Sequence, residues 1–104
     1  MEKFILYVGL NDQNKKKQII STKKATKKLN ELLLNKYELA GATIQNGNGI
    51  YKHSSGKIVK EKSFIVTLLD VESHIIDLII RDLKTLFNQE SILKEKQTMK
   101  YSFE

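Results

Sequence analysis

Two short stretches of the chain are almost continuously apolar. The first is Phe4–Val8, which is followed by Gly9, and the second is Phe64–Leu69, within the longer extended segment 58–69. Apolar runs of this length that are rich in β-branched and aromatic residues predict strands. Because neither run alternates with polar residues, we expect both strands to be covered on two faces, at the centre of a sheet.

Two other segments repeat their apolar residues at the spacing of a helix. The first is predicted to begin after an N-cap at Ser21 or Thr22 and to end near Tyr37. Its apolar positions recur at i, i+4, i+7 and i+8, along one face; they are Ala25, Leu29, Leu32 and Leu33. The second helix is predicted from about Glu72 to Phe87. Its apolar arc consists of Ile75, Ile76, Ile79, Ile80, Leu83, Leu86 and Phe87.

The remaining regular segments are predicted to be strands at the sheet edges. Ala42–Gln45 and Ile50–His53 flank two glycines, Gly47 and Gly49. Glycines inside an extended run indicate a bulge or a close backbone approach. A turn at 54–57 then forms a hairpin with residues 58–69. The last strand is predicted from about 91 to 103, because apolar and polar residues alternate in its second half.

The predicted order is strand, helix, hairpin, helix, strand, and it spans residues 1–104 as a single domain. This is the ferredoxin-like βαββαβ pattern of the α+β class, a four-stranded antiparallel sheet with two helices on one face. An apolar sheet face that no helix covers marks an interaction surface. We therefore expect a homodimer formed through the open face of the sheet.

The amino-acid composition limits the cellular locations and the kinds of chemical site that are expected for this chain. The chain contains no cysteine, which excludes disulfides, thiolate metal sites and a cysteine nucleophile. No segment approaches the roughly 18 apolar residues of a membrane helix. The polar residues 11–14 follow the first apolar run without a cleavage site, so this run does not resemble a signal peptide. We expect a cytoplasmic protein with no membrane partner and no cofactor.

The net charge of +6 is concentrated in the first third of the chain. Residues 1–36 contain nine lysines and three acidic residues, whereas residues 37–104 are balanced. Seven of these lysines lie on the predicted loop and on one helical face: Lys15, Lys16, Lys17, Lys23, Lys24, Lys27 and Lys28. Such a patch is a candidate surface for nucleic acid or for an acidic host protein. A solvated outer helix face explains the same pattern, and the arginines and interleaved aromatics typical of nucleic-acid binding are missing.

Several short motifs together resemble a domain family of unknown function found in small bacterial and mobile-element proteins. The matching pieces are 6–10 (Leu-Tyr-Val-Gly-Leu), Gly47 and Gly49 with Tyr51, 56–61 (Gly-Lys-Ile-Val-Lys-Glu), 87–91 (Phe-Asn-Gln-Glu-Ser) and 102–103 (Ser-Phe). The aromatic position after the glycines is often tryptophan in such sequences, and here it is tyrosine. The resemblance implies the same two-layer fold and a link to plasmids, phages or integrative elements. Small proteins of that kind often counter host defence, and some are anti-CRISPR inhibitors.

A possible pocket combines residues from three predicted segments: Tyr7, Gly47, Gly49, Tyr51, Glu61, Gln89 and Glu90. Two carboxylates can perform acid–base chemistry if their environments separate their pKa values. The structural alternative is that Glu61 forms a cross-strand ion pair and that Gln89 and Glu90 fix the entry of the last strand. No catalytic residue and no metal site are predicted, since His53 and His74 lack partners at ligand spacing.

Three functions remain open from the sequence. The favoured one is a non-enzymatic inhibitor from a mobile element or phage, of the anti-CRISPR type, which occupies a host effector or its nucleic acid. The second is a nucleic-acid-binding accessory protein that uses the lysines of 15–28. The third is a small-molecule-binding domain or weak enzyme with its pocket near Gly47, Gly49, Glu61 and Glu90.

Overall fold

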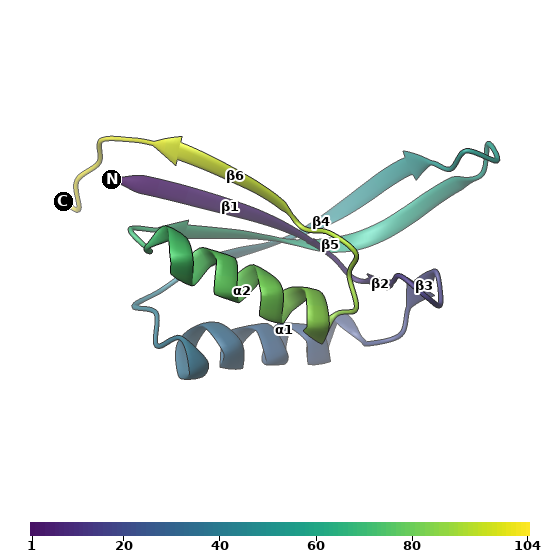
Figure 1. Ribbon diagram of the computed structural model, residues 1–104, viewed down its shortest axis with the longest axis horizontal. Coiled ribbons are helices and arrows are strands. Elements are labelled where there is room, and N and C mark those ends of the chain that lie inside the picture. The colour runs from purple at the N-terminus through teal and green to yellow at the C-terminus, as the bar shows by residue number, and fades with distance from the viewer.

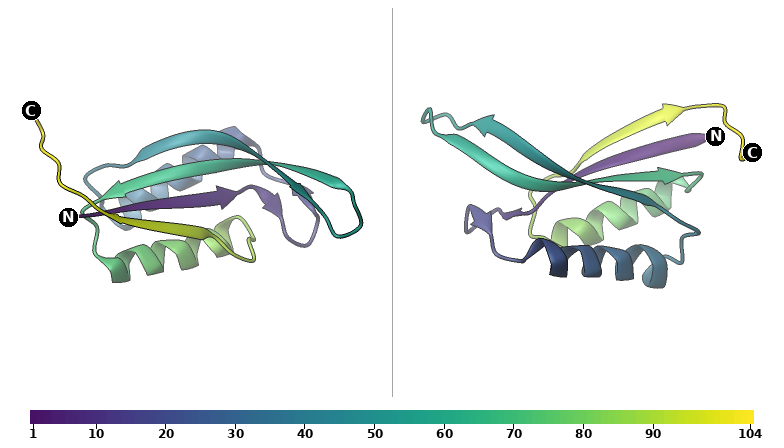
Figure 2. Two further views of the ribbon diagram at one scale, coloured as in Figure 1. Left: turned by 90° about the horizontal axis from the view of Figure 1, so that it is seen from above. Right: turned by 180° about the vertical axis from the view of Figure 1, so that it is seen from behind.

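The computed structural model describes residues 1–104 (Figure 1). In chain order the elements are β1 (Glu2–Gly9), β2 (Asn11–Asp12), β3 (Lys17–Gln18), α1 (Thr22–Asn30), the π-helical turn η1 (Glu31–Lys36), β4 (Thr43–Lys52), β5 (Ile58–Leu69), α2 (Ser73–Leu86) and β6 (Leu93–Thr98). Strands β4, β5, β1 and β6 form one antiparallel sheet in that order. Both helices lie on the same face of this sheet (Figure 2). The predicted α+β ferredoxin-like fold is confirmed.

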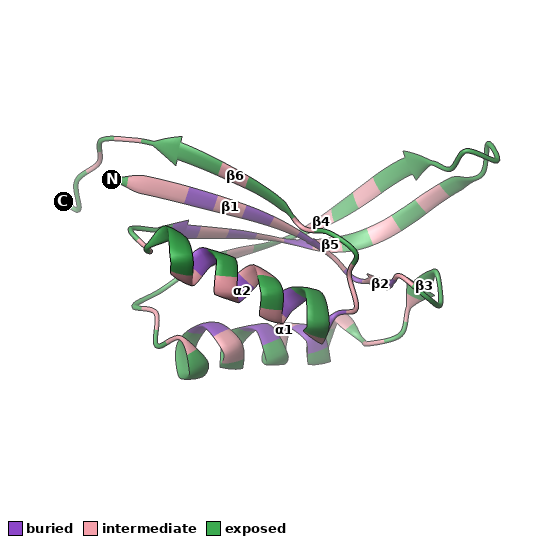
Figure 3. Cartoon of the chain, viewed as in Figure 1, coloured by how far each residue is buried: buried purple, intermediate pink, exposed green.

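The core lies between the two central strands and the helices. Within residues 4–8 of β1 and 64–68 of β5, every second residue is buried against the helices, and these residues are Phe4, Leu6, Val8, Phe64, Val66 and Leu68. They meet buried residues of the helices, so that purple bands face each other across the layers in Figure 3. Each Leu, Val or Phe side chain removed from water in this way contributes about 1.5–3 kcal/mol. The predicted central position of the two apolar strands is confirmed.

The first helix begins where the sequence predicts but changes its winding. Ser21 caps α1 by accepting a hydrogen bond from the backbone N–H of Lys24 at 3.2 Å. After Asn30 the chain continues as the π-helical turn η1, in which the N–H of Tyr37 donates to the carbonyl of Leu32. In an α-helix, two residues that are four positions apart point in directions that differ by about 40° around the helix axis. The wider π turn opposes this rotation, so that Tyr37 still faces α2.

Two predictions about the strands are wrong. Pairing between β4 and β5 is continuous from Thr43↔Thr67 to Lys52↔Ile58, so the glycines cause no bulge. A Cβ at Gly47 would lie 3.0 Å from the hydroxyl oxygen of Ser63, so the group that approaches this glycine is a side chain and not the predicted backbone. The last strand ends at Thr98 rather than near residue 103. Its neighbour β1 begins with Glu2, which pairs with Thr98, so residues beyond Met99 have no strand beside them.

The β4–β5 hairpin extends well past the helices. Its outer half, residues 48–62, is called the arm here, and none of its residues is buried. The arm rises away from the helical layer (Figures 1 and 2) and helps to stretch the molecule to 47 Å, against 26 and 24 Å in the other directions. Under the base of the arm lies the small β2–β3 hairpin, in a segment that the sequence predicts as a loop. No helix has both the length and the apolar character needed to cross a membrane.

Candidate functional site

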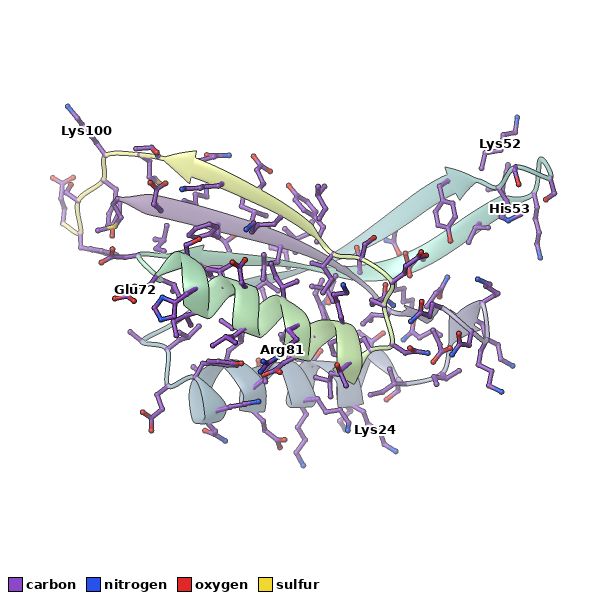
Figure 4. The ribbon with its side chains drawn as sticks, in the orientation of Figure 1. Lys24, Lys52, His53, Glu72, Arg81 and Lys100 are labelled. Atoms are coloured by element: carbon purple, nitrogen blue, oxygen red, sulfur yellow. The ribbon has the colours of Figure 1, made fainter.

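A groove of about 720 Å³ lies between the arm, the β2–β3 hairpin and the segment that leads into β6. The arm contributes Tyr51 and Glu61, the small hairpin contributes Lys16 and Lys17, and the third wall is 89–91. Figure 4 shows His53, another lining residue, near the outer end of the arm. Only three of the seventeen lining residues are hydrophobic. The polar and charged side chains of this lining offer hydrogen-bond and ion-pair partners to a small, charged ligand.

Glu61 is the acidic group at the base of the groove. Its Oε2 accepts a hydrogen bond from the backbone N–H of Asn11 at 2.9 Å. The side-chain amide of Asn11 also donates to the carbonyl of Lys60 at 3.2 Å, which ties the end of β1 to β5. No lysine or arginine forms an ion pair with Glu61, so the predicted cross-strand ion pair is wrong. A backbone donor holds the carboxylate instead.

Asp12 fixes the loop that carries the groove lysines. It is buried, with 6% of its surface exposed. Its Oδ1 accepts the backbone N–H groups of Asn14 and Lys15, both at 2.9 Å, and its Oδ2 accepts the side-chain amide of Asn88 at 3.0 Å. The hydrogen bond from Asn88, followed by that from Lys15, lowers the pKa of Asp12 below its usual value. These hydrogen bonds fix the backbone of the loop, and the loop places Lys16 and Lys17 in the wall of the groove.

The residues after α2 also form hydrogen bonds to the loop that contains Asp12. The Nε2 of Gln89 donates to the backbone carbonyl of Asn11 at 2.6 Å. Asn88 has a positive φ of 47° and accepts hydrogen bonds from the backbone and the side chain of Gln13, at 3.0 and 2.9 Å. Gln89 thus fixes the path into the last strand, as the structural alternative predicts. Glu90 is exposed and lines the groove without a hydrogen bond to the protein.

The groove mixes both signs of charge with one large aromatic ring. Glu61 and Glu90 are its acidic lining residues besides Asp12, and its basic lining residues are Lys16, Lys17, Lys57 and Lys60. Tyr51 is 51% exposed, so its ring is accessible from solvent. Such a surface can bind a cationic group at the carboxylates, an anionic group at the lysines and a flat ring against the tyrosine.

The structure brings together only part of the predicted pocket. Tyr51, Glu61, Gln89 and Glu90 line the groove, whereas Gly49 lines a second hollow of about 570 Å³ that shares Glu61. Gly47 lines neither of them.

Tyr7 is also absent from the groove, because it points to the open face of the sheet. Its hydroxyl donates to Oε1 of Glu95 at 2.9 Å, and this hydrogen bond raises the pKa of Tyr7. The sequence analysis missed Asp12 and Asn88. No pattern marks a buried aspartate within a polar loop.

The seven lysines of the predicted lysine face are all exposed: Lys15, Lys16, Lys17, Lys23, Lys24, Lys27 and Lys28. Lys24 points away from the sheet in Figure 4. None of the seven forms an ion pair with an acidic side chain. Lys16 and Lys17 line the groove, whereas the α1 lysines lie outside it. The binding role of the α1 lysines stays a prediction.

Solved structures share this fold. A phage SAM lyase in its apo state is 22% identical, with a TM-score of 0.66, over 92% of this chain and 78% of the lyase chain. The phage SAM lyase in complex with S-methyl-5′-thioadenosine is 23% identical, with a TM-score of 0.67, over 92% and 79%. The divalent cation tolerance protein CutA of Archaeoglobus fulgidus is 18% identical, with a TM-score of 0.61, over 99% and 88%. At these identities the likeness shows the fold.

These neighbours correct the favoured functional prediction. The function favoured from the sequence is a non-enzymatic anti-CRISPR inhibitor that occupies a host effector or its nucleic acid. That prediction is wrong, because the structural neighbours are an enzyme, the phage SAM lyase, and the CutA protein. The link to mobile elements that the resemblance implies carries no information about a site.

The amino-acid sequence itself matches one protein family. None of the curated proteins matches it. The family model described as "protein of unknown function (DUF3574)" matches residues 3–103, which is nearly the whole chain. This confirms the resemblance to a family of unknown function. The chain belongs to the DUF3574 family.

Proposed function

We propose that the chain is an enzyme that binds S-adenosylmethionine in the groove and cleaves it to S-methyl-5′-thioadenosine. The observation that carries the proposal is the combination of the Glu61 carboxylate, the accessible ring of Tyr51 and a wall of lysines in one groove. S-adenosylmethionine presents a sulfonium and an ammonium cation, a carboxylate and a flat purine. Each of these groups has a complementary partner in the groove.

The size of the groove supports this substrate. Its volume of about 720 Å³ falls within the roughly 300–1,000 Å³ of typical small-molecule sites. Tyr51 offers a π-face on which the purine stacks. Lys16 and Lys17 offer ammonium groups to the substrate carboxylate. Glu61 and Glu90 attract the ammonium and sulfonium charges.

The reaction breaks the bond between the sulfonium sulfur and the four-carbon amino acid, and the sulfur keeps the electron pair. The carbon fragment then follows one of two balanced routes. Its own carboxylate attacks the carbon that leaves sulfur and closes a lactone, or a proton from the adjacent carbon passes to Glu61 and an alkene forms. In the first route the groove supplies orientation, and in the second it also supplies a base. The two products are isomers that proton NMR distinguishes.

The test is to incubate the purified protein with S-adenosylmethionine and to quantify S-methyl-5′-thioadenosine by chromatography. We expect Glu61→Gln to lower the rate by about 100-fold or more, because a positioned carboxylate contributes roughly 10²–10⁴-fold. Glu31→Gln is the matched control, since Glu31 is exposed and distant in the fold, on η1. The proposal fails if the wild-type protein forms no product above the uncatalysed rate.

The function implied by the other neighbour has less support in this chain. The printed description of CutA refers to divalent cation tolerance. Divalent cations prefer clusters of carboxylate or imidazole ligands. The structure contains no group of three or more His, Cys, Asp or Glu side chains that could hold a metal ion.

Self-association through the open sheet face is a further part of the proposal. On the open face Tyr7 lies between Ile65 and Leu93 in the strand register, and Leu93 is 66% exposed. Ile5 lies on the same face, two residues before Tyr7 on β1. Covering these side chains with a second copy removes apolar surface from water. A cytoplasmic location is also proposed, because the chain lacks the cysteines with which small exported domains form disulfides.

A further inference from the structure

We propose that Gly9 and Asn11 form a cradle that holds the Glu61 carboxylate in its working position, and that Gly9 is therefore a positioning residue of the site. This inference rests on the proposed function, because it assigns a purpose to the orientation of Glu61. The cradle itself is a feature of the fold and can be tested without a substrate.

The first observation is the absence of free space above Gly9. A Cβ built at this glycine would lie 2.5 Å from both Cδ and Oε2 of Glu61, and 2.6 Å from Oε1. Real Cβ atoms essentially never approach other atoms this closely. The carboxylate therefore occupies the volume that any other side chain at position 9 would need.

The demand for glycine at this position is steric. The positive-φ residues of the chain include a single glycine, Gly56, so the backbone of Gly9 is open to any residue. In addition, Gly9 is the last residue of β1, where it pairs with Ser63 of β5. Glycine within a paired strand often marks a place where another group approaches closely. The approaching group is the Glu61 carboxylate.

The second observation is the hydrogen-bond donor that faces the same carboxylate. The N–H of Asn11 donates to Oε2 of Glu61 at 2.9 Å. Asn11 is itself fixed from two sides, since its side-chain amide donates to Lys60 and its carbonyl accepts Nε2 of Gln89 at 2.6 Å. The donor therefore has a defined position, set by β5 and by the segment after α2.

Together these contacts leave one oxygen of Glu61 for a ligand. Oε2 is engaged by Asn11, whereas Oε1 has no hydrogen-bond partner in the protein. Glu61 lines the groove. A carboxylate with one oxygen anchored and the other free is preorganised to accept a hydrogen bond or a proton from a bound molecule.

The substitution Gly9→Ala separates this role from folding. The atoms that meet the new methyl group are the far end of a flexible side chain, so Glu61 can turn away while the strand pairing persists. We expect a folded protein with a displaced carboxylate. Gly41→Ala is the matched control, because a Cβ at Gly41 meets nothing within 4 Å.

The experiment compares the wild-type protein with Gly9→Ala, Glu61→Gln, the double variant and Gly41→Ala. The first readout is the backbone amide resonance of Asn11 in ¹H–¹⁵N NMR spectra, without any substrate. We expect Gly9→Ala and Glu61→Gln to shift this resonance, and Gly41→Ala to leave it in place. The cradle is refuted if the Asn11 resonance of Gly9→Ala coincides with that of the wild type.

The second readout is the rate of S-methyl-5′-thioadenosine formation. We expect Gly9→Ala to lower kcat by about 100-fold, the scale of a misplaced catalytic group, and to change KM much less. In the Glu61→Gln background the same substitution should cause no further loss, because both changes remove one function. Additive losses would contradict the positioning role. If the wild type is inactive while the Asn11 resonance responds as expected, the cradle stands and the proposed reaction is abandoned.

Discussion

Asp82 is the most heavily hydrogen-bonded carboxylate between the helices. Its Oδ2 accepts the hydroxyl of Tyr37 at 2.5 Å and the ammonium of Lys36 at 2.7 Å, and Arg81 contacts its Oδ1 at 3.3 Å. The side chain of Asp82 is only 16% exposed. The hydrogen bond from Lys36, followed by that from Tyr37, lowers the pKa of Asp82 from 3.8 to about 2. The cluster joins α2 to the end of η1.

Replacing Asp82 with asparagine should therefore destabilise the fold. We expect a loss of about 1–2 kcal/mol in the free energy of unfolding at pH 7, since hydrogen bonds to a charged group are stronger than neutral ones and solvent screens the exposed Lys36. Urea denaturation measures this difference. Asp77→Asn, whose carboxylate is 63% exposed, is the control and should change stability little.

The pH dependence of the same cluster has a defined sign. Because folding lowers the pKa of Asp82 from 3.8 to about 2, its stabilisation is complete well above pH 3.8 and declines as the pH falls towards 2. The gap in stability between the wild type and Asp82→Asn should accordingly narrow in acid. A gap that stays constant between pH 7 and pH 2.5 would contradict the assignment.

At the scale of elements, the first helix is anchored by a narrow apolar stripe. Only Ala25 and Leu29 of α1, and Leu33 of η1, are buried. Leu29 has no exposed surface, whereas Leu34 is 50% exposed. We expect Leu29→Ala to lower the free energy of unfolding by about 2–5 kcal/mol, because it removes core contacts and leaves a cavity. Leu34→Ala serves as the control, and equal losses for the two variants would refute this packing.

The elements were predictable to different extents. The central strands and both helices follow from apolar runs and helical spacing, which report burial directly. The π turn η1 was not predictable, because apolar residues at helical spacing indicate a helix but not its winding. The end of β6 was also missed, since the alternation of Met99, Tyr101 and Phe103 continues past the point where β1 stops pairing. Alternation of apolar and polar residues shows which residues suit a strand. The extent of the neighbouring strand determines where the strand ends.

The site was less predictable than the fold for the same reason. Four residues of the predicted pocket line one groove, because the ferredoxin-like topology brings the β4–β5 hairpin close to the entry of β6; they are Tyr51, Glu61, Gln89 and Glu90. The third wall was missed, since a polar loop around Asp12 has no periodic pattern. Lys16 and Lys17 were predicted to lie on a loop and to share a binding surface with the lysines of the first helix, whereas the structure places them in the wall of the groove.

At the scale of the whole molecule, the helices cover one sheet face and leave the other open. We expect analytical ultracentrifugation to give twice the 12.0 kDa mass of one chain. Leu93→Glu places a charge at a 66% exposed apolar position of the open face and should shift the protein towards monomers. A wild-type protein that sediments as a monomer, or as an assembly larger than a dimer, would contradict the proposed homodimer.

The three walls of the groove come from residues 11–18, 51–61 and 89–91, which are far apart along the chain. No fragment that lacks the last third of the sequence can assemble all of them. Ligand binding therefore requires the complete fold. A chain whose C-terminal segment has detached from β1 should not bind the ligand. A molecule that binds only the folded chain, in which all three walls are assembled, raises the melting temperature by mass action. Screening compounds by thermal shift would thus search for substrates and monitor the integrity of the fold in a single assay.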